Sequence, residues 1–354
     1  MKTKASILLL SFFILITFWL SGCELSDILG SSQISNNSDA PLTISFIDVG
    51  QGDSTLIECE NEAMLIDAGL YGNREKVINY LSSRNIKNLR YCVATHPHSD
   101  HIGGMDAVIY TFDVDTLVYP EVKSESASWN YLLDACDERG VSYYNPEVSD
   151  TFTLGGAELT VLSPAKGAEY ENTNNTSLVL KLTYGDVSFM FTGDAEKEVE
   201  RELLESSFDL RADVLKCGHH GSSTSTTKEF LEAVNPFSAV ISCGKGNDYG
   251  HPHSETVTNL KNQNVQIYRT DKSSTIVAQS DGKEITFFSA SGSEITQSKT
   301  ETTLFEYIGN TSSYVFHRSD CASVKDMKEK NKMYFITKTE AVLMGYTPCG
   351  ACKP

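Results

Sequence analysis

The sequence predicts an α/β fold with two sheets and helices outside them, followed by a small separate domain. Short β-type runs alternate with helical patterns from residue 42 onward, beginning in the order strand, strand, strand, helix, strand. A second β-rich stretch with its own helices follows and ends near residue 291. The chain has 354 residues, and 40% of them are hydrophobic, which is enough to bury a sizeable core.

The individual elements are placed by their apolar patterns. Strands are expected at residues 42–50, 54–59, 63–69, 89–96, 115–120, 157–164, 177–185, 187–194, 212–218, 238–244, 275–280 and 284–290. Helices are expected at residues 73–85, 128–140, 197–206 and 228–235. The run at 292–303 is low in apolar residues and is interpreted as a linker, so the large domain covers 42–291 and the small one 304–354.

The first residues are interpreted as an export signal. An apolar segment at residues 7–20 follows two lysines and is too short for a confident spanning helix. It ends in Leu-Ser-Gly-Cys, which resembles the bacterial lipobox and implies that Cys23 is lipidated. We therefore expect a signal peptide at 1–22, a polar flexible tether at 23–41 and an outward-facing membrane lipoprotein. An ordinary cleaved signal or an uncleaved anchor is the alternative, and either version exports the protein.

The charge balance limits the classes of partner. The formal net charge is -18 at pH 7 and the sequence pI is near 4.8. Broad electrostatic capture of a phosphate backbone needs clusters of Lys and Arg, which oppose this charge. Any contact with nucleic acid is therefore expected to be local or mediated by metal.

A dense set of metal-ligand side chains follows the strand at 89–96. The run His-Pro-His-Ser-Asp-His supplies His96, His98, Asp100 and His101 within six positions. Imidazole nitrogens and carboxylate oxygens suit zinc and other divalent first-row metals. A histidine-rich surface loop without metal is the alternative. Four ligand groups so close together, directly after a strand, favour a site for two ions.

This run resembles the HxHxDH signature of the metallo-β-lactamase superfamily, and the segments at 46–54, 174–180, 191–196 and 219–223 resemble the hydrolase domain of ComEC-type competence proteins. The resemblance covers nearly all of residues 42–291. It implies a four-layer αββα fold and hydrolytic chemistry. It also implies that Asp67 buttresses the metal loop.

The resemblance implies a site for two divalent metals, zinc or manganese, held by histidines and aspartates. The ligands are His96 and His98 for the first metal, Asp100, His101 and His251 for the second, and Asp194 as the bridge, with His253 as the alternative to His251. The implied catalytic residues are His220, Asp100 and Asp194. Of the pair His219 and His220, the second is expected to stay off the metal and to contact the scissile phosphate.

One feature departs from the superfamily pattern. Many members carry a further metal-binding histidine before the bridging aspartate, but residues 102–193 contain no histidine. ComEC-type domains also tend to lack it, and Asn174 or Asn175 is expected near the first metal. That site is then more oxygen-rich, which favours manganese over zinc.

The predicted function is an exported hydrolase that attacks a phosphodiester, most simply DNA, with metal-bound hydroxide. One alternative is an esterase of small phosphoesters of the phosphorylcholine type, which the acidic surface favours. Another is a catalytically weak metalloprotein that binds DNA or a cell-wall partner. True β-lactamase action is not indicated by any part of the pattern.

The tail carries a second ligand pattern. The spacing H-x3-C followed by C-x2-C predicts one structural zinc bound by His317, Cys321, Cys349 and Cys352. A Cys349–Cys352 disulfide is the alternative in an exported protein. The tail resembles the Ada-type zinc-binding domain, whose parent is a DNA-repair methyl acceptor. His317 stands where that domain has its reactive cysteine, so methyl transfer to this position is not expected.

The remaining charged and cysteine residues of interest carry weaker predictions. DNA contact by the tail would use a basic group, Arg318, Lys328, Lys330 and Lys332, for which a solvated face is the alternative. The other cysteines are interpreted as mostly buried small apolar residues with at most one pair, namely Cys59, Cys92, Cys136, Cys217 and Cys243.

Overall fold

The structure is a computed structural model that describes residues 40–295, 306–328 and 331–354. The predicted signal peptide with Cys23, and most of the predicted tether and linker, lie outside the described residues. Within the described ranges, no helix is long and apolar enough to cross a membrane.

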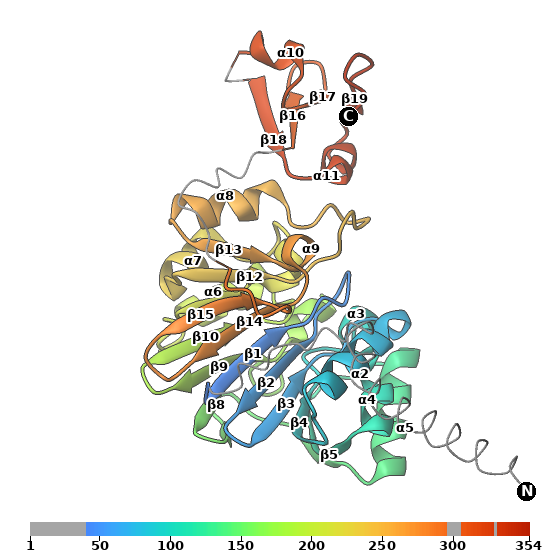
Figure 1. Ribbon diagram of the computed structural model, residues 1–354, viewed down its shortest axis with the longest axis vertical. Helices are drawn as coiled ribbons and strands as arrows, with labels where there is room; N and C mark the ends of the chain where they lie inside the picture. The colour runs from blue at the N-terminus through green and yellow to red at the C-terminus, as the bar shows by residue number, and fades with distance from the viewer. Residues whose placement is uncertain (1–39, 296–305, 329–330) are drawn as a thin grey trace, which may run out of the picture. The chain divides into compact units, whose positions relative to one another are not determined.

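The first sheet has eight strands and is half antiparallel, half parallel (Figure 1). Its order is β15-β14-β1-β2-β3-β4-β5-β6. The strands are β1 Leu42–Phe46, β2 Thr55–Cys59, β3 Glu62–Ile66, β4 Asn88–Val93, β5 Asp113–Val118, β6 Ser142–Tyr144, β14 Ile276–Ser280 and β15 Ile285–Ser289. Strands β3 to β6 run parallel to one another, and the remaining neighbours pair antiparallel.

The second sheet repeats this division with seven strands in the order β13-β12-β11-β10-β9-β8-β7. The strands are β7 Thr151–Leu154, β8 Ala157–Ser163, β9 Val179–Tyr184, β10 Val187–Phe191, β11 Val214–Lys216, β12 Ser238–Ile241 and β13 Gln266–Arg269. Strands β10 to β13 are parallel, and β7 to β10 pair antiparallel.

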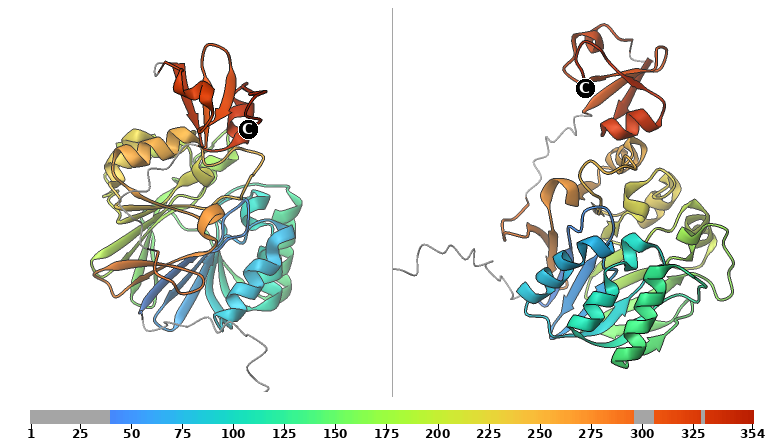
Figure 2. Two further views of the ribbon diagram at one scale, coloured as in Figure 1. Left: turned by 45° about the horizontal axis from the view of Figure 1, so that its top comes forward. Right: turned by 90° about the vertical axis from the view of Figure 1, so that its right-hand side faces the viewer.

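The longer helices cover the outer face of each sheet (Figures 1 and 2), and the shorter helices and turns lie in the loops at the strand ends. Those of the first half are η1 Tyr71–Asn73, α2 Arg74–Ser83, α3 Ser99–Ile102, α4 Met105–Thr111 and α5 Ala127–Arg139. Those of the second half are η2 Thr173–Thr176, α6 Lys197–Glu205, η3 Gly218–Gly221, α7 Lys228–Val234, α8 Ser254–Asn262 and α9 Thr270–Ser273. The prediction of two sheets with helices outside is confirmed.

Three apolar clusters hold these four layers together. Alternate strand residues point to opposite faces of a sheet, so neighbours such as Leu56 and Ile57 serve different clusters. Ile57 packs between the sheets with Phe189, whereas Leu56 packs under α2, α4 and α5. Leu215 likewise packs with α6, α7 and α8 on the far side. A strictly internal set and two outer sets are what an αββα arrangement requires.

The tail forms its own four-stranded sheet in the order β18-β16-β17-β19. Its elements are β16 Tyr307–Asn310, β17 Val315–Arg318, α10 Ala322–Lys325, β18 Lys332–Phe335, α11 Lys338–Leu343 and β19 Thr347–Pro348. Its buried apolar side chains are few and include Phe316 and Phe335. A domain of this size has little core to stabilise it.

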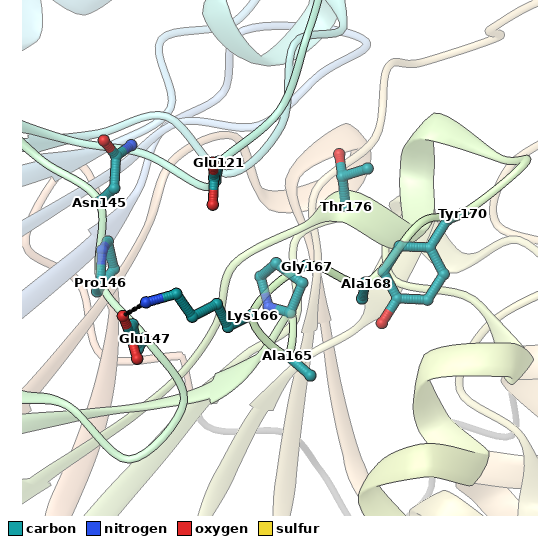
Figure 3. Close-up of a pocket in the computed structure, with 11 residues that line it drawn as sticks. Glu121, Asn145, Pro146, Glu147, Ala165, Lys166, Gly167, Ala168, Tyr170 and Thr176 are labelled. Atoms are coloured by element: carbon teal, nitrogen blue, oxygen red, sulfur yellow. Dashed lines mark hydrogen bonds and ion pairs between the residues drawn. The ribbon is translucent and has the colours of Figure 1, made fainter.

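Two hollows of the large domain flank one turn, η2. The first, of about 360 Å³, has Thr176 in its wall together with Asn145, Tyr170 and the ion-paired Glu147 and Lys166 (Figure 3). The second, of about 310 Å³, has Asn174 in its wall. Of the two, only the second is lined by metal-ligand side chains predicted from the sequence, namely His98, Asp100, Asp194 and His251.

Candidate metal centre

The predicted ligands lie just beyond the carboxyl ends of strands that run in the same direction. Asp67 directly follows β3, and His96, Asp194 and His219 each come three residues after the end of β4, β10 and β11, respectively. Carboxyl ends of parallel strands meet at one edge of a sheet and commonly form the ligand site of α/β folds. Both sheets therefore deliver their polar loops to a common edge.

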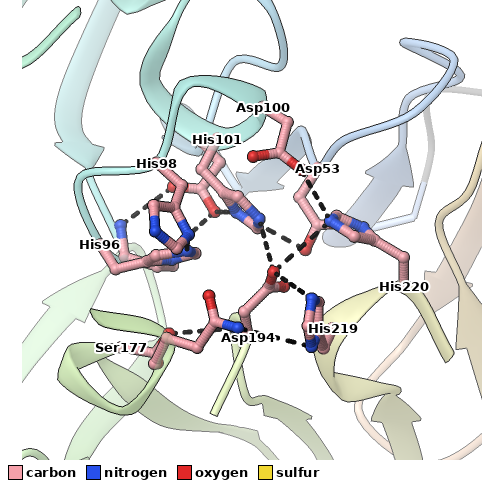
Figure 4. Close-up of polar contacts among 12 residues, drawn as sticks. Asp53, His96, His98, Asp100, His101, Ser177, Asp194, His219 and His220 are labelled. Atoms are coloured by element: carbon pink, nitrogen blue, oxygen red, sulfur yellow. Dashed lines mark hydrogen bonds and ion pairs between the residues drawn. The ribbon is translucent and has the colours of Figure 1, made fainter. Parts of the chain in front are cut away.

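The loop after β4 brings its three histidines together. His96 Nε2 lies 3.0 Å from His98 Nδ1, so the two rings face a common point (Figure 4). His101, on the short helix α3, is fully buried, and its ring centroid is 4.2 Å from that of His96. Burial lowers the pKa of His96 well below its usual range, which keeps its nitrogen free of a proton and able to bind a metal.

Asp67 fixes this loop from beneath, as the resemblance implies. Its carboxylate accepts hydrogen bonds from the backbone N–H of Thr95 at 2.9 Å and from the Thr95 hydroxyl at 2.7 Å. It also lies 2.7 Å from His101 Nδ1. A carboxylate on Nδ1 leaves Nε2 of the same imidazole to face a metal.

Asp194 occupies the middle of the cluster. Its Oδ2 is 3.2 Å from His101 Nε2 and 3.5 Å from His220 Nε2. Burial would raise the pKa of Asp194, but the neighbouring His101 and His220 hold it well below its usual range. Ser177 supports the loop, because the Asp194 backbone N–H donates to its hydroxyl at 3.0 Å. This central, ionised position suits a bridging ligand.

The two histidines after β11 project in different directions because their backbone is left-handed. His219 and His220 have φ of 48° and 54°, and Gly221 follows with φ of 84°. Left-handed backbone is disfavoured for residues that carry a Cβ, so this turn is strained. Strain of this kind persists where the surrounding structure fixes it, commonly at functional sites.

His220 belongs to the buried ligand cluster. Its Nε2 lies 3.1 Å from Asp100 Oδ2, and the side chain is 1% exposed. Burial would lower the pKa of His220, but the charges of Asp194 and Asp53 and the hydrogen bonds from both sides raise it to about 10. Displacing that proton lets Nε2 bind a metal, so the geometry suits a ligand better than the expected position off the metal.

His219 instead forms part of the pocket wall. Its Nδ1 lies 3.1 Å from Glu196 Oε1 and 3.3 Å from the Thr224 hydroxyl. The side chain is 24% exposed, and Nε2 stays 3.8 Å from Asp194 Oδ2. Burial lowers the pKa of His219 despite the nearby carboxylates.

His251 and its alternative, His253, have different surroundings in the structure. His251 is buried, lines the pocket and stacks on Tyr249 with ring centroids 5.6 Å apart. Its Nδ1 has no hydrogen-bond partner among the described residues, and burial lowers its pKa to about 3. His253 contacts Ser223 and the Tyr249 carbonyl and does not line this pocket.

Asn174, and not Asn175, faces the pocket where the superfamily histidine is missing. Its Nδ2 donates to Glu196 Oε1 at 3.0 Å, while its Oδ1 is buried without a hydrogen-bond partner among the described residues. Asn175 is occupied on both sides, by Glu198 and by the backbone N–H of Glu196. A free amide oxygen beside the first site fits the expectation of an oxygen-rich ligand set.

Two residues of this centre were missed by the sequence analysis. Asp53 joins His101, Asp194 and His220 in a group whose ligand atoms all lie within 4.8 Å of one another. Lys216, at the end of β11, forms an ion pair with Asp53 and is 3% exposed. The motif that contains Asp53 was noted only as a resemblance, and Lys216 reads as an ordinary strand-end lysine.

The cluster fits a divalent metal site. We use "His/Asp cluster" for His96, His98, Asp100, His101, Asp194 and His220. Asp194 Oδ1 is buried without a hydrogen-bond partner among the described residues. Burying such an atom costs free energy unless a partner is supplied. Carboxylates and imidazoles converging on one buried point are the donor set that zinc and manganese use.

The tail carries the second group of ligands, here called the Cys/His cluster. Its members are His317, Cys321, Cys349 and Cys352, and their ligand atoms lie within 4.8 Å of one another. All cysteines of the described residues are free thiols, so the alternative Cys349–Cys352 disulfide is absent. Backbone N–H groups of Cys352 and Ala351 lower the pKa of Cys349, which favours the thiolate that zinc binds.

The other sequence expectations have mixed outcomes. Cys59, Cys92, Cys136, Cys217 and Cys243 are buried free thiols, as expected of small apolar residues. In the basic group of the tail, Arg318 forms an ion pair with Asp320, and Lys330 lies outside the described residues. The expectation of DNA contact there stays a prediction.

A comparison with protein-family models matches residues 47–245 to the model described as "Metallo-beta-lactamase superfamily". Among curated relatives, the ComE operon protein 3 of Bacillus subtilis (strain 168) is 35% identical over 251 residues, which are 66% of this chain and 32% of the relative. The competence protein ComA of Neisseria gonorrhoeae is 28% identical over 228 residues, 64% of this chain and 30% of the relative.

A third relative is named as a nuclease. The exodeoxyribonuclease YycJ of Bacillus anthracis is 24% identical over 174 residues, 48% of this chain and 63% of the relative. The chain spans about a third of the length of the two competence proteins.

Proposed function

Because the chain belongs to the metallo-β-lactamase superfamily, we propose that it is a metal-dependent phosphodiesterase that cleaves DNA. The observation that carries this proposal is the His/Asp cluster beside an open pocket of about 310 Å³, because the ligand atoms of its buried members His101, Asp194 and His220 lie within 4.8 Å of one another. The similarity to competence proteins and to an exodeoxyribonuclease supports DNA as the substrate class.

The residues divide into two sets of metal ligands. His96, His98 and the free Oδ1 of Asn174 would hold the first metal. Asp100, His101 and His220 would hold the second, so in this proposal His220 takes the place expected for His251, which lines the pocket beside Tyr249. Asp194 would be shared by both. When bound, such a pair activates water and stabilises the charge that develops on an attacked phosphodiester.

His219 is the pocket residue best placed to handle a proton. Glu196 Oε1 lies 3.1 Å from His219 Nδ1 and holds the proton on that nitrogen, which leaves Nε2 toward the pocket. A nearby phosphate charge favours the protonated form of this imidazole, whose Nε2–H then donates a hydrogen bond to a phosphate oxygen. We therefore propose that His219, and not His220, assists departure of the leaving oxygen.

Two features of the pocket surroundings support a polymeric substrate. Tyr249 lines the pocket and is 59% exposed, so its ring offers a face on which a base can stack. The hollow shown in Figure 3 adjoins the same turn η2, since Asn174 and Thr176 each line one hollow. Room on both sides of one turn accommodates more than a small phosphoester.

The first test is cleavage of plasmid and single-stranded DNA by the metal-loaded chain without residues 1–22, with manganese or zinc. His98→Ala is expected to abolish cleavage, because His98 belongs to the His/Asp cluster. The matched control is His253→Ala, which removes a nearby histidine outside the cluster and should retain cleavage.

Absence of DNA cleavage by metal-loaded wild-type protein would contradict the DNA proposal. Hydrolysis of bis(p-nitrophenyl) phosphate or a choline phosphodiester under the same conditions would then move the substrate class to small phosphoesters. Failure on every phosphoester would contradict the enzymatic proposal itself.

We also propose that the protein is exported and anchored by a lipid on Cys23. This proposal rests on residues 1–23 of the sequence alone. Incorporation of radiolabelled palmitate by the wild-type chain but not by Cys23→Ala is the expected result. Equal labelling of both chains would contradict it.

A further inference from the structure

Lys216 is a buried cation next to the His/Asp cluster, and the proposed reaction does not use it. Its side chain is 3% exposed, and Nζ is paired with Asp53 Oδ2. Taking an ammonium group out of water costs several kcal/mol unless a countercharge lies against it. A lysine retained beside a site that collects positive metal ions therefore calls for a physical explanation.

Asp53 links this lysine to a proposed metal ligand. While Oδ2 contacts Lys216, Oδ1 lies 3.2 Å from His220 Nδ1. The main chain also holds Asp53, because its N–H donates to the Asp100 carbonyl at 3.1 Å and its carbonyl accepts from Gly69 at 2.8 Å. Asp53 is thus fixed at both its backbone and its carboxylate.

The arrangement parallels the pair formed by Asp67 and His101. In each pair a carboxylate contacts Nδ1 of a histidine whose Nε2 points to Asp194. Asp67 is held by the neutral donors of Thr95. Among the described residues, the Asp53 carboxylate has no threonine donor of this kind and is held instead by the charge of Lys216.

We propose that Lys216 is a positioning residue for the metal centre. Its ion pair holds Asp53 where Asp53 accepts the Nδ1 proton of His220, so that His220 Nε2 is presented to the metal. The inference rests on the proposed role of His220 as a metal ligand. Carboxylates that orient metal-binding histidines typically contribute 10-fold to 100-fold to metal affinity.

A rival arrangement makes the opposite prediction. Asp53 lies within the group of four whose ligand atoms converge, so it is also able to bind the metal directly. Lys216 would then compete with the metal for Asp53. Removing the lysine charge would strengthen metal binding in that case and weaken it in ours.

The test is a manganese titration of metal-free full-length protein, with free Mn²⁺ followed by electron paramagnetic resonance. Lys216→Met keeps the aliphatic stem and removes the charge. We expect about tenfold weaker binding, at the lower end of the usual range, because the Ser242 carbonyl at 3.1 Å is a second acceptor for His220 Nδ1. Unchanged or tighter binding would overturn the proposal.

The matched control is Lys181→Met. Lys181 also pairs with an aspartate, Asp209, at 3.3 Å, but it contacts no member of the His/Asp cluster. Its substitution should leave manganese affinity unchanged. Lys216→Arg, which keeps the charge, should restore most of the affinity lost in Lys216→Met, and failure to do so would indicate a packing role only.

Two further measurements separate positioning from folding. The d–d absorption spectrum of the Co²⁺ form should change in Lys216→Met, because the ligand field depends on how His220 is oriented. If Lys216→Met does not fold, the same titration uses Asp53→Asn and the double variant Asp53→Asn/Lys216→Met, which removes both charges of the ion pair. The double variant should lose no more affinity than Asp53→Asn, since the two residues act as one unit, and additive losses would contradict this.

These experiments use no substrate. A failure of the DNA proposal therefore leaves their outcome untouched, and a failure here leaves the nuclease assay untouched.

Discussion

The two ligand clusters of this protein are built by different rules. The His/Asp cluster draws its ligands from loops after strands of both sheets, over residues 96–220. The Cys/His cluster draws all four from residues 317–352 of a tail with a small apolar core. The first places nitrogen and oxygen ligands at a pocket, as a catalytic metal requires, and the second supplies three thiols and an imidazole, the set of a closed structural zinc. Loss of metal should therefore cost chemistry at one cluster and folding at the other.

The largest expected effect is at the centre of the His/Asp cluster. Asp194→Ala removes the central carboxylate and should lower the rate of phosphodiester hydrolysis by about 10³-fold or more, with the tail zinc retained. Steady-state kinetics and metal analysis check this. Asp186→Ala, an exposed aspartate on the preceding hairpin, is the control and should behave as wild type. Equal activity of Asp194→Ala and Asp186→Ala would contradict a catalytic role for the His/Asp cluster.

The next effect concerns the tail. Cys321→Ser should remove one equivalent of zinc and unfold residues 304–354, because structural zinc contributes on the order of 10 kcal/mol to small domains. The His/Asp cluster should keep its metal. Metal analysis and limited proteolysis of the tail check both statements, with the exposed Ser323→Ala as the neighbouring control. A tail that resists protease without zinc would show that its apolar core suffices.

The third prediction concerns the pH dependence of metal binding at the His/Asp cluster. In the metal-free protein the pKa of His220 is raised from 6.5 to about 10, so the proton is present at neutral pH and a metal must displace it. Each displaced proton should make the apparent affinity of the His/Asp cluster rise by up to about tenfold per pH unit below the pKa of its group, and Asp194 and Asp67 raise the pKa of the ligand His101 as well. Competition with a chelating dye measures it. An affinity independent of pH would remove His220 from the ligands.

The same shift predicts the opposite trend for the stability of the metal-free protein. A folded-state pKa above the unfolded value contributes stability that is complete below about pH 6.5 and is lost as pH rises toward 10. Urea unfolding in the presence of a chelator should show this decline for wild type. His220→Gln should reduce this decline without removing it. Burial would lower the pKa of His101, but Asp194 and Asp67 raise it well above its usual range, so His101 contributes the same trend.

The smallest effect is expected at the pocket rim. Tyr249→Ala should raise KM for single-stranded DNA about fivefold, because stacking on a base contributes about 1 kcal/mol or more. The KM for a choline phosphodiester, which has no aromatic ring to stack, should not change. Tyr131→Ala, at a similarly exposed tyrosine on α5, is the control. Equal KM changes for both substrates would argue against base stacking.

The sequence predicts two sheets with helices outside, and the metal loop, because both depend on local patterns. Period-2 apolar runs mark the strands, and His96 to His101 stand together in the chain. Helices α4 and α8 were not predicted, since α4 has seven residues and α8 buries only Val257 and Leu260 as apolar side chains. Short amphipathic segments depend on tertiary packing more than on their own propensity.

The partners of Asp53 could not be predicted for a different reason. Lys216 and His220 are more than 160 residues away from Asp53, and only the loops at one edge of the two sheets bring them together. The roles of His219 and His220 likewise depend on backbone dihedrals that no residue pattern encodes.

The left-handed turn at His219 and His220 has a consequence for the protein's evolution in the laboratory. Each of the two residues costs about 1 kcal/mol relative to glycine in the same conformation, and asparagine tolerates it better than histidine. Libraries screened for thermostability alone should therefore accumulate Gly or Asn at these two positions. Libraries that must also cleave a phosphodiester should keep histidine. Sequencing the two pools would show, for each of the two positions, whether histidine lowers thermal stability and is kept only when cleavage is required.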